Sequence, residues 1–181
     1  MLDYLVTAFT GPGAAFMYAI TALGALSLTI VIERMVLLLK WSSAGEGSPQ
    51  AEVLAAGRAQ TDADAAWDAM GGSAAAQEER IRRRIGALGA VANIATMLGL
   101  LGTVYGLILA FSALGDAGAG EKAVRLSEGI STAMATTAWG LVVGIPSLGF
   151  HALLDGMARS RVAAIEAAAG ALAAELRASV D

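Results

Sequence analysis

Long apolar stretches without charged residues alternate with shorter polar stretches along this chain. No Asp, Glu, Lys or Arg occurs in residues 11–32, 85–115 or 129–154. A helix needs about 20 apolar residues to cross the hydrocarbon core of a bilayer, and each stretch reaches that length. The pattern therefore predicts an all-α membrane protein with three transmembrane helices, at about residues 12–39, 85–114 and 129–154.

The polar stretches between these helices complete a single membrane domain over residues 1–181. Residues 40–84 form the first loop, in which a Gly/Ser-rich linker precedes an Ala-rich segment of helical composition. Residues 115–128 are expected to be a short polar outer loop. The Ala-rich tail, residues 155–181, is expected to extend the third helix beyond the membrane.

Composition narrows the class of protein further. The chain is 56% hydrophobic and only 15% charged, whereas an average soluble domain is roughly 25% charged. High hydrophobicity also excludes intrinsic disorder. The absence of cysteine excludes disulfides and thiolate metal sites, and the net charge of −4 argues against a nucleic-acid partner.

Basic residues are distributed unequally between the two sides of the membrane. Of the 12 Lys and Arg residues, all but Lys122 and Arg125 lie between the charge-free stretches of helices one and two or after helix three. The positive-inside rule then predicts an outer (periplasmic) N-terminus and a cytoplasmic C-terminus. Residues 1–10 contain no basic residue, unlike a signal peptide, so we expect the first helix to be retained.

Small residues recur at helical spacing in the second and third helices. Membrane helices associate through such residues because they let two backbones approach closely. Helix one has only Gly24 and Ser27 in a comparable pattern, so it is expected to face lipid. The candidate packing residues are Gly99, Gly102 and Gly106 on helix two and Gly140 and Gly144 on helix three.

The same two helices carry most of the intramembrane hydroxyl groups. Such side chains often bond only to their own helix, to the carbonyl four residues earlier; their concentration here favours a polar pore lining instead. The candidates for an ion path are Thr103, Thr132, Thr136 and Thr137. An ion path usually needs an ionisable group, so either this chain does not conduct or a partner supplies the carboxylate.

Two further residues of helix three have structural interpretations. Pro146 cannot donate a hydrogen bond to the carbonyl four residues earlier, so a kink is expected there. His151 is the only histidine, and its place near the cytoplasmic end favours a polar anchor at the membrane interface over a proton relay.

Two segments of the sequence resemble a known family. GLLGTVYGL, from Gly99, and GISTAMATTAWGLVVGIP, from Gly129 to Pro146, resemble the paired signatures of the MotA/TolQ/ExbB proton-channel family, most closely its ExbB/TolQ branch. The resemblance implies a three-helix subunit of a homopentamer in the bacterial inner membrane, surrounded by lipid. It also implies that helices two and three line a pore.

The resemblance further implies a partner and a mechanism. A dimer of a single-helix protein of the ExbD, TolR or MotB type would occupy the pore, and its membrane Asp would carry the proton. The complex would be a motor driven by the proton-motive force, with H⁺ favoured over Na⁺ as the coupling ion and no cofactor. Thr103 and Thr137 match the pore threonines of the family, and Pro146 matches its kink position.

One position departs from the family pattern. Many ExbB and TolQ proteins have a glutamate where this chain has Thr132, and Glu128 lies a full turn earlier. A mechanism that needs a channel-side carboxylate is therefore not supported by this chain alone.

Other function classes remain as alternatives. No enzymatic motif such as a P-loop, GxSxG or HExxH occurs, so we do not expect an enzyme. A non-conducting oligomeric scaffold would also use the glycine stripes. A small secondary transporter is less favoured, because the chain has no internal repeat or substrate-binding charge.

Overall fold

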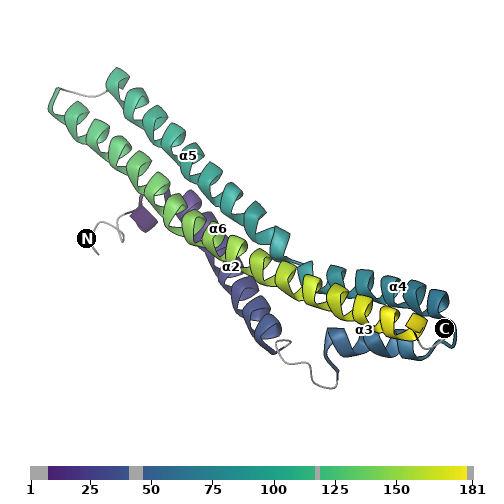
Figure 1. Ribbon diagram of the computed structural model, residues 1–181. Coiled ribbons are helices and arrows are strands. Elements are labelled where there is room, and N and C mark those ends of the chain that lie inside the picture. The colour runs from purple at the N-terminus through teal and green to yellow at the C-terminus, as the bar shows by residue number, and fades with distance from the viewer. Residues whose placement is uncertain (1–7, 41–46, 117–118, 179–181) are drawn as a thin grey trace. The chain divides into compact units, whose positions relative to one another are not determined.

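The computed structural model describes residues 8–40, 47–116 and 119–178, and these residues form helices and short connections without a strand. Figure 1 shows the order of the helices along the chain. They are α2 (Ala14–Lys40), α3 (Pro49–Arg58), α4 (Ala63–Arg82), α5 (Ile85–Asp116) and α6 (Ala119–Ala178). The predicted all-α class is confirmed.

Among the described residues, three helical stretches are long and apolar enough to cross a membrane. They are Ala14–Lys40, Ala63–Ser112 and Glu121–Ala178, and each contains most or all of one charge-free stretch of the sequence. The prediction of a multi-pass membrane protein with three spanning helices is thus confirmed.

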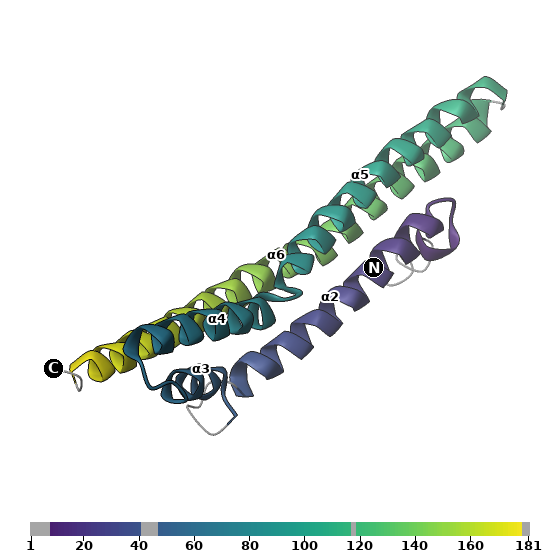
Figure 2. The ribbon, with the colours of Figure 1, turned by 90° about the vertical axis from the view of Figure 1, so that its right-hand side faces the viewer.

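The chain divides into two compact units. The first comprises residues up to 31 and residues 87–150, and the second comprises residues 32–86 and those from 151 onward. In the first unit α5 and α6 run side by side, as both views of the ribbon show (Figures 1 and 2). Its buried positions are mainly small, among them Ala92, Ala95, Ala110 and Ala133, which is typical of helices that pack inside a membrane.

The second unit is a helical bundle with a more conventional core. Its buried side chains are larger and come from α3, α4 and the end of α6; they include Val53, Met70, Ile81 and Leu154. Side-chain caps begin two of its helices: the Ser48 hydroxyl accepts from the Ala51 N–H, and the Asp62 carboxylate accepts from the Ala65 N–H. Such caps stabilise helix ends by satisfying backbone donors that have no intrahelical partner.

The segment expected to be an outer loop is largely helical. Residues 115–128 were expected to be a loop, yet α6 begins at Ala119. Glu121 lies in its first turn and forms an ion pair with Arg125 at 2.7 Å. An acidic residue near a helix N-terminus stabilises a helix, and so does an ion pair between residues four apart. The loop was expected only because the segment is polar, and a polar segment can also form an exposed helix.

The third helix continues far beyond the membrane stretch, as its Ala-rich tail suggested. Helix α6 has 60 residues and runs through Pro146 to Ala178 without a break. The expected kink at Pro146 stays a prediction. The Gly/Ser-rich linker after α2 lies largely outside the described residues, since residues 41–46 are not among them.

Candidate functional site

Glycines bring the backbones of α5 and α6 into direct contact. A Cβ atom placed on Gly99 would lie 3.2 Å from the Cα of Gly140, and one placed on Gly140 would lie 2.8 Å from the Ala95 carbonyl oxygen. A Cβ on Gly106 would lie 2.7 Å from the backbone nitrogen of Ala133. At Gly140 and Gly106 an added Cβ would lie closer to backbone atoms than real Cβ atoms do, and at Gly99 it would be tightly packed, so the glycines of α5 and α6 meet directly.

Two threonines join the helices at the centre of this contact. The hydroxyl groups of Thr103 on α5 and Thr137 on α6 are hydrogen-bonded to each other. Each also lies 3.2 Å from the carbonyl oxygen of Gly99, and Thr103 lies 3.2 Å from that of Ala133. Both side chains are half-buried. They therefore do more than bond within their own helix.

Thr136 is placed differently from its neighbour. Its side chain is 1% exposed, and its hydroxyl donates to the carbonyl oxygens of Thr132 and Ala133, 3.2 and 3.1 Å away. A Cβ on Gly102 would lie 2.6 Å from the Thr136 hydroxyl. Within one chain, Thr136 thus fills the space that Gly102 leaves open.

Thr132 borders a groove between α6 and the residues that precede α2. A Cβ on Gly13 would lie 2.6 Å from the Thr132 methyl group. The groove has a volume of about 350 Å³, and Glu128 lies on its wall together with Thr132. Its remaining lining residues are Ala8, Gly11, Pro12, Ser127, Ser131 and Ala135. The ion-path role of Thr103, Thr132, Thr136 and Thr137 stays a prediction.

Helix α2 packs on α6 through polar and small residues, which the sequence reading undervalued. The Ser27 and Ser147 hydroxyls are hydrogen-bonded at 2.7 Å, and the Trp139 indole N–H donates to the Thr21 hydroxyl at 2.9 Å. A Cβ on Gly24 would lie 3.1 Å from Val143. The Gly24 and Ser27 pattern was the available signal. Helix α2 is therefore not solely a lipid-facing helix.

The opposite side of α2 does expose apolar surface. Tyr18 is 60% exposed and Leu26 50%, and their positions lie across the helix from Gly24 and Ser27. One side of this helix thus suits a lipid environment, while Gly24 and Ser27 mark the side that packs on α6. The expectation of a lipid-facing helix holds for only part of its circumference.

Gly144 and Pro146 lie near one end of the contact between α5 and α6. A Cβ on Gly144 would lie 2.6 Å from the Thr96 hydroxyl, so Gly144 packs closely against α5. Pro146 is exposed. Next to it, the Ser147 hydroxyl donates to the Val143 carbonyl at 2.8 Å.

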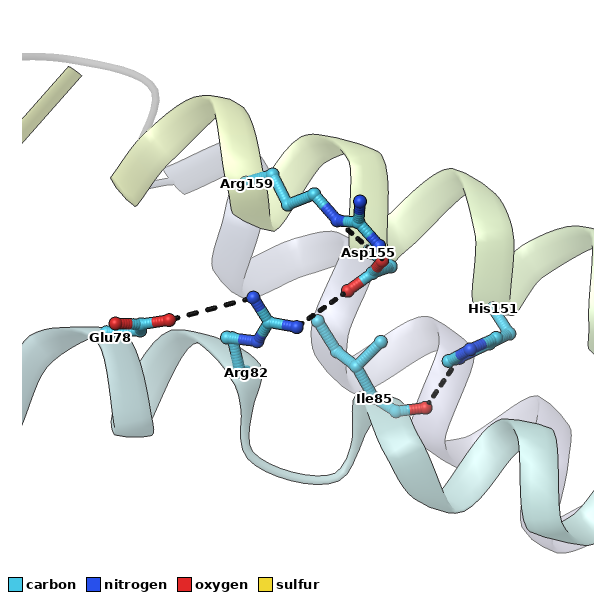
Figure 3. Close-up of polar contacts among 6 residues, drawn as sticks. All are labelled: Glu78, Arg82, Ile85, His151, Asp155 and Arg159. Atoms are coloured by element: carbon cyan, nitrogen blue, oxygen red, sulfur yellow. Dashed lines mark hydrogen bonds and ion pairs between the residues drawn. The ribbon is translucent and has the colours of Figure 1, made fainter. Parts of the chain in front are cut away.

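Ion pairs in the second unit surround the junction of α4 with α5 (Figure 3). The Arg82 guanidinium lies 3.6 Å from Glu78 and 3.5 Å from Asp155, and Arg159 donates to the same Asp155 carboxylate at 2.9 Å. His151 Nδ1 lies 3.0 Å from the Ile85 carbonyl oxygen. This polar contact joins His151 to the start of α5, and its expected role as an anchor at the membrane interface stays a prediction.

The junction itself contains an unusual backbone conformation. Arg84 has φ of 67°, in the left-handed region that residues other than glycine rarely occupy. Its guanidinium lies 2.6 Å from the Glu33 carboxylate of α2. Arg34, which follows Glu33 on α2, is buried and donates to the Arg80 carbonyl at 3.2 Å. Sequence periodicity gave no signal for these pairings between distant residues.

The contact between α5 and α6 lies within stretches that contain no Asp, Glu, Lys or Arg, so these residues include no charged side chain that could carry a proton. The threonines of the α5–α6 contact can donate and accept hydrogen bonds, but a hydroxyl does not titrate in the physiological range. Within the described residues, no group of three or more His, Asp and Glu side chains could hold a metal ion. The arrangement can therefore line a path, and it requires a titratable group from elsewhere to bind and release protons.

Comparison with known proteins adds an independent observation. The sequence profile of the MotA/TolQ/ExbB proton channel family matches residues 46–167, about two thirds of the chain. The matched residues include α3, α4, α5 and most of α6.

Three curated proteins are similar to parts of the chain. The Biopolymer transport protein ExbB of Aquifex aeolicus is 34% identical over 54% of this chain and 66% of its own length. The Putative biopolymer transport protein ExbB-like 1 of Synechocystis is 40% identical over 44% of this chain and 32% of its own length. A Putative biopolymer transport protein ExbB homolog of Methanothermobacter thermautotrophicus is 34% identical over 46% of this chain and 29% of its own length. The chain thus matches less than two thirds of each relative.

Proposed function

The chain belongs to the MotA/TolQ/ExbB proton channel family, in its ExbB branch, and on this basis we propose that it is the channel subunit of an energy-transducing membrane complex. A flow of protons through the complex would drive mechanical work in the cell envelope. The family match and the three apolar helices support this role. The protein would act as a channel and motor subunit and not as an enzyme.

The observation that carries the proposal is the polar but non-ionisable contact between α5 and α6. Thr103 and Thr137 form a hydrogen-bonded pair in the middle of two stretches without charge. Hydroxyl groups can switch between donating and accepting as a neighbouring carboxylate gains or loses a proton. This chain would therefore supply the wall of the path, and another chain would supply the proton carrier.

The partner that fits is a single-helix membrane protein of the ExbD, TolR or MotB type with one membrane aspartate. Two copies of it would lie inside a pentamer of this chain. An aspartate is inexpensive inside a membrane only when it faces a polar cavity, which a ring of threonine hydroxyls would provide. Protons are favoured over Na⁺ because the family is one of proton channels. No cofactor is needed.

The topology proposed for this complex follows the distribution of basic residues. The N-terminus would lie in the periplasm and the C-terminus in the cytoplasm, with the protein in the bacterial inner membrane. Arg82, Arg83 and Arg84 would then lie at the cytoplasmic surface, where basic residues are preferred.

Native mass spectrometry in mild detergent tests the assembly directly. The chain would be expressed with a single-helix protein of the ExbD or TolR type and purified through a tag on that partner. We expect five copies of this chain with two of the partner. Strictly monomeric chain, or a tagged partner that brings none of this chain with it, would contradict the proposal.

A second candidate function is a non-conducting oligomeric scaffold. The close glycine contacts of α5 with α6 favour it, because they would stabilise a helix bundle whether or not ions move. The scaffold predicts assembly without any proton flux. The channel proposal predicts that flux appears when the partner is present.

A further inference from the structure

Asn93 is a polar side chain in an unfavourable place. It lies on α5, about 12 Å along the helix from Ile85, where the helix begins. Its side chain is exposed, and it forms no hydrogen bond or ion pair with any residue that the structure describes. Lipid offers no hydrogen bond, and an unsatisfied polar group in the hydrocarbon region costs several kcal/mol. Its amide therefore needs a partner outside this chain.

The face of α5 that bears Asn93 is apolar and points away from α6. Met97 is 66% exposed, Leu100 55% and Val104 54%. They lie four, seven and eleven residues after Asn93, about one, two and three helical turns, so all of them share one side of the helix with it. The glycines that contact α6 lie on the other side. A second helix can therefore approach this face and cover Asn93.

A matching acceptor lies on α6. Pro146 has no N–H, so the Val142 carbonyl lacks the donor that an α-helix normally provides. The neighbouring Ser147 hydroxyl donates to the Val143 carbonyl, so it does not replace the missing donor at Val142. Val142 is 57% exposed and Ile145 64%, so the helix surface next to this carbonyl is open.

The donor and the acceptor lie at the same level of the helix pair. Gly140 packs against the Ala95 carbonyl, and Gly144 packs against the Ala92 carbonyl, where added Cβ atoms would lie 2.8 and 3.2 Å away. Val142 lies between these two glycines, and Asn93 lies between the two alanines. A second copy of the chain in the same membrane orientation would hold its Val142 carbonyl at the depth of Asn93.

We propose that Asn93 of one copy donates through its side-chain amide to the Val142 carbonyl of the next copy. The donor and acceptor lie on different helices of one chain, so the contact is head-to-tail and repeats around a ring, which can close. The apolar faces around Met97 and Ile145 then cover each other. This interface rests on the homo-oligomer of the proposed function and names the contact that builds it.

Engineered cysteines test the proximity of the two faces. The chain contains no cysteine, so Met97→Cys in one tagged copy and Leu141→Cys in a differently tagged copy are the only thiols. Both native side chains are exposed, beside Asn93 and Val142 respectively. We expect oxidation to join the two tags. Phe111→Cys with Leu141→Cys is the matched control, because Phe111 lies about 21 Å further along α5 and should give no crosslink.

Substitutions test the hydrogen bond itself. Asn93→Leu should raise the dissociation constant of the oligomer roughly threefold to tenfold, the usual effect of one hydrogen bond between membrane helices. In a Pro146→Ala background the same change should have less than a roughly twofold effect, since the Val142 carbonyl regains a backbone donor. Met97→Leu, which keeps the apolar face, should leave the oligomer unchanged.

Equal effects of Asn93→Leu in both backgrounds, or no crosslink between positions 97 and 141, would overturn the interface. Crosslinking of position 97 to the single-helix partner would overturn it as well. Apart from the crosslinking to the partner, these measurements use this chain alone, and none of them uses an ion gradient. A failed interface therefore leaves the channel proposal intact, and an intact interface without ion flux would contradict only the channel proposal.

Discussion

The hydroxyl groups of Thr103 and Thr137 are hydrogen-bonded to each other across the α5–α6 contact, and both lie against the Gly99 carbonyl. The pair joins the two signature segments of the family through polar side chains of both helices. It links the packing of the helices to the proposed path of the proton.

Replacing these hydroxyls should stop ion flow without stopping assembly. Thr137→Val and Thr103→Val keep the side-chain shape but remove the hydrogen bonds, so we expect proton flux to fall roughly tenfold or more, which corresponds to about 1.4 kcal/mol in the barrier. Thr137→Ser keeps the hydroxyl and is the matched control. Flux can be measured in proteoliposomes with the partner. Full flux in the double Val variant would remove the proposed role.

The glycine contacts predict a position-dependent effect of a single methyl group. Gly106→Ala should destabilise the protein by about 2 kcal/mol, because its Cβ would meet the backbone of α6 and the helices must separate. Gly149→Ala is the matched control, since nothing lies within 4 Å of its added Cβ, and it should change stability by less than about 0.5 kcal/mol. Thermal unfolding in detergent measures both, and equal effects would contradict the contact.

The backbone of Arg84 predicts that glycine is better tolerated there than alanine. Arg84→Ala and Arg84→Gly both remove the ion pair with Glu33. Only alanine keeps the steric cost of the positive φ, which is about 1–2 kcal/mol. We therefore expect the alanine variant to unfold at a lower temperature than the glycine variant. The reverse order would show that Arg84 does not hold a left-handed conformation.

The two serines that join α2 to α6 predict an asymmetry. Ser27→Ala leaves the Ser147 hydroxyl with its bond to the Val143 carbonyl, so the loss should be about 0.6 kcal/mol. Ser147→Ala leaves the buried Ser27 hydroxyl without its partner and should cost more, about 1–3 kcal/mol. Unfolding of both variants in detergent checks the order. A larger cost for Ser27→Ala would contradict these hydrogen bonds of the two serines.

The sequence predicted the spanning helices and the α5–α6 contact because both depend on local, repeated signals. The length of an apolar stretch without charged residues predicts a membrane helix, and glycines at helical spacing predict a close contact between two helices. Gly99, Gly106 and Gly140 all lie where that spacing suggested. Thr136 lies four residues before Gly140, so spacing also places it in the stripe of small residues on α6. Its contact with Gly102 appears only in the structure.

Other features depend on partners distant in the sequence. Arg84 and Glu33 form an ion pair across 51 positions, and charge pairs of this kind leave no periodic pattern. The packing of α2 through Ser27 was undervalued for a related reason, because one serine and one glycine are weak signals until their counterparts on α6 are known. The helical start of α6 was missed because a polar composition suits both a loop and an exposed helix.

The central claim is that this chain forms the wall of a proton path and that a partner carries the proton. Proton flux into liposomes under an imposed gradient tests it most directly, with this chain alone, with its single-helix partner, and with a partner whose membrane Asp is changed to Asn. We predict flux only in the second case. Equal flux from the chain alone, or from the complex with the Asn variant, would contradict the account.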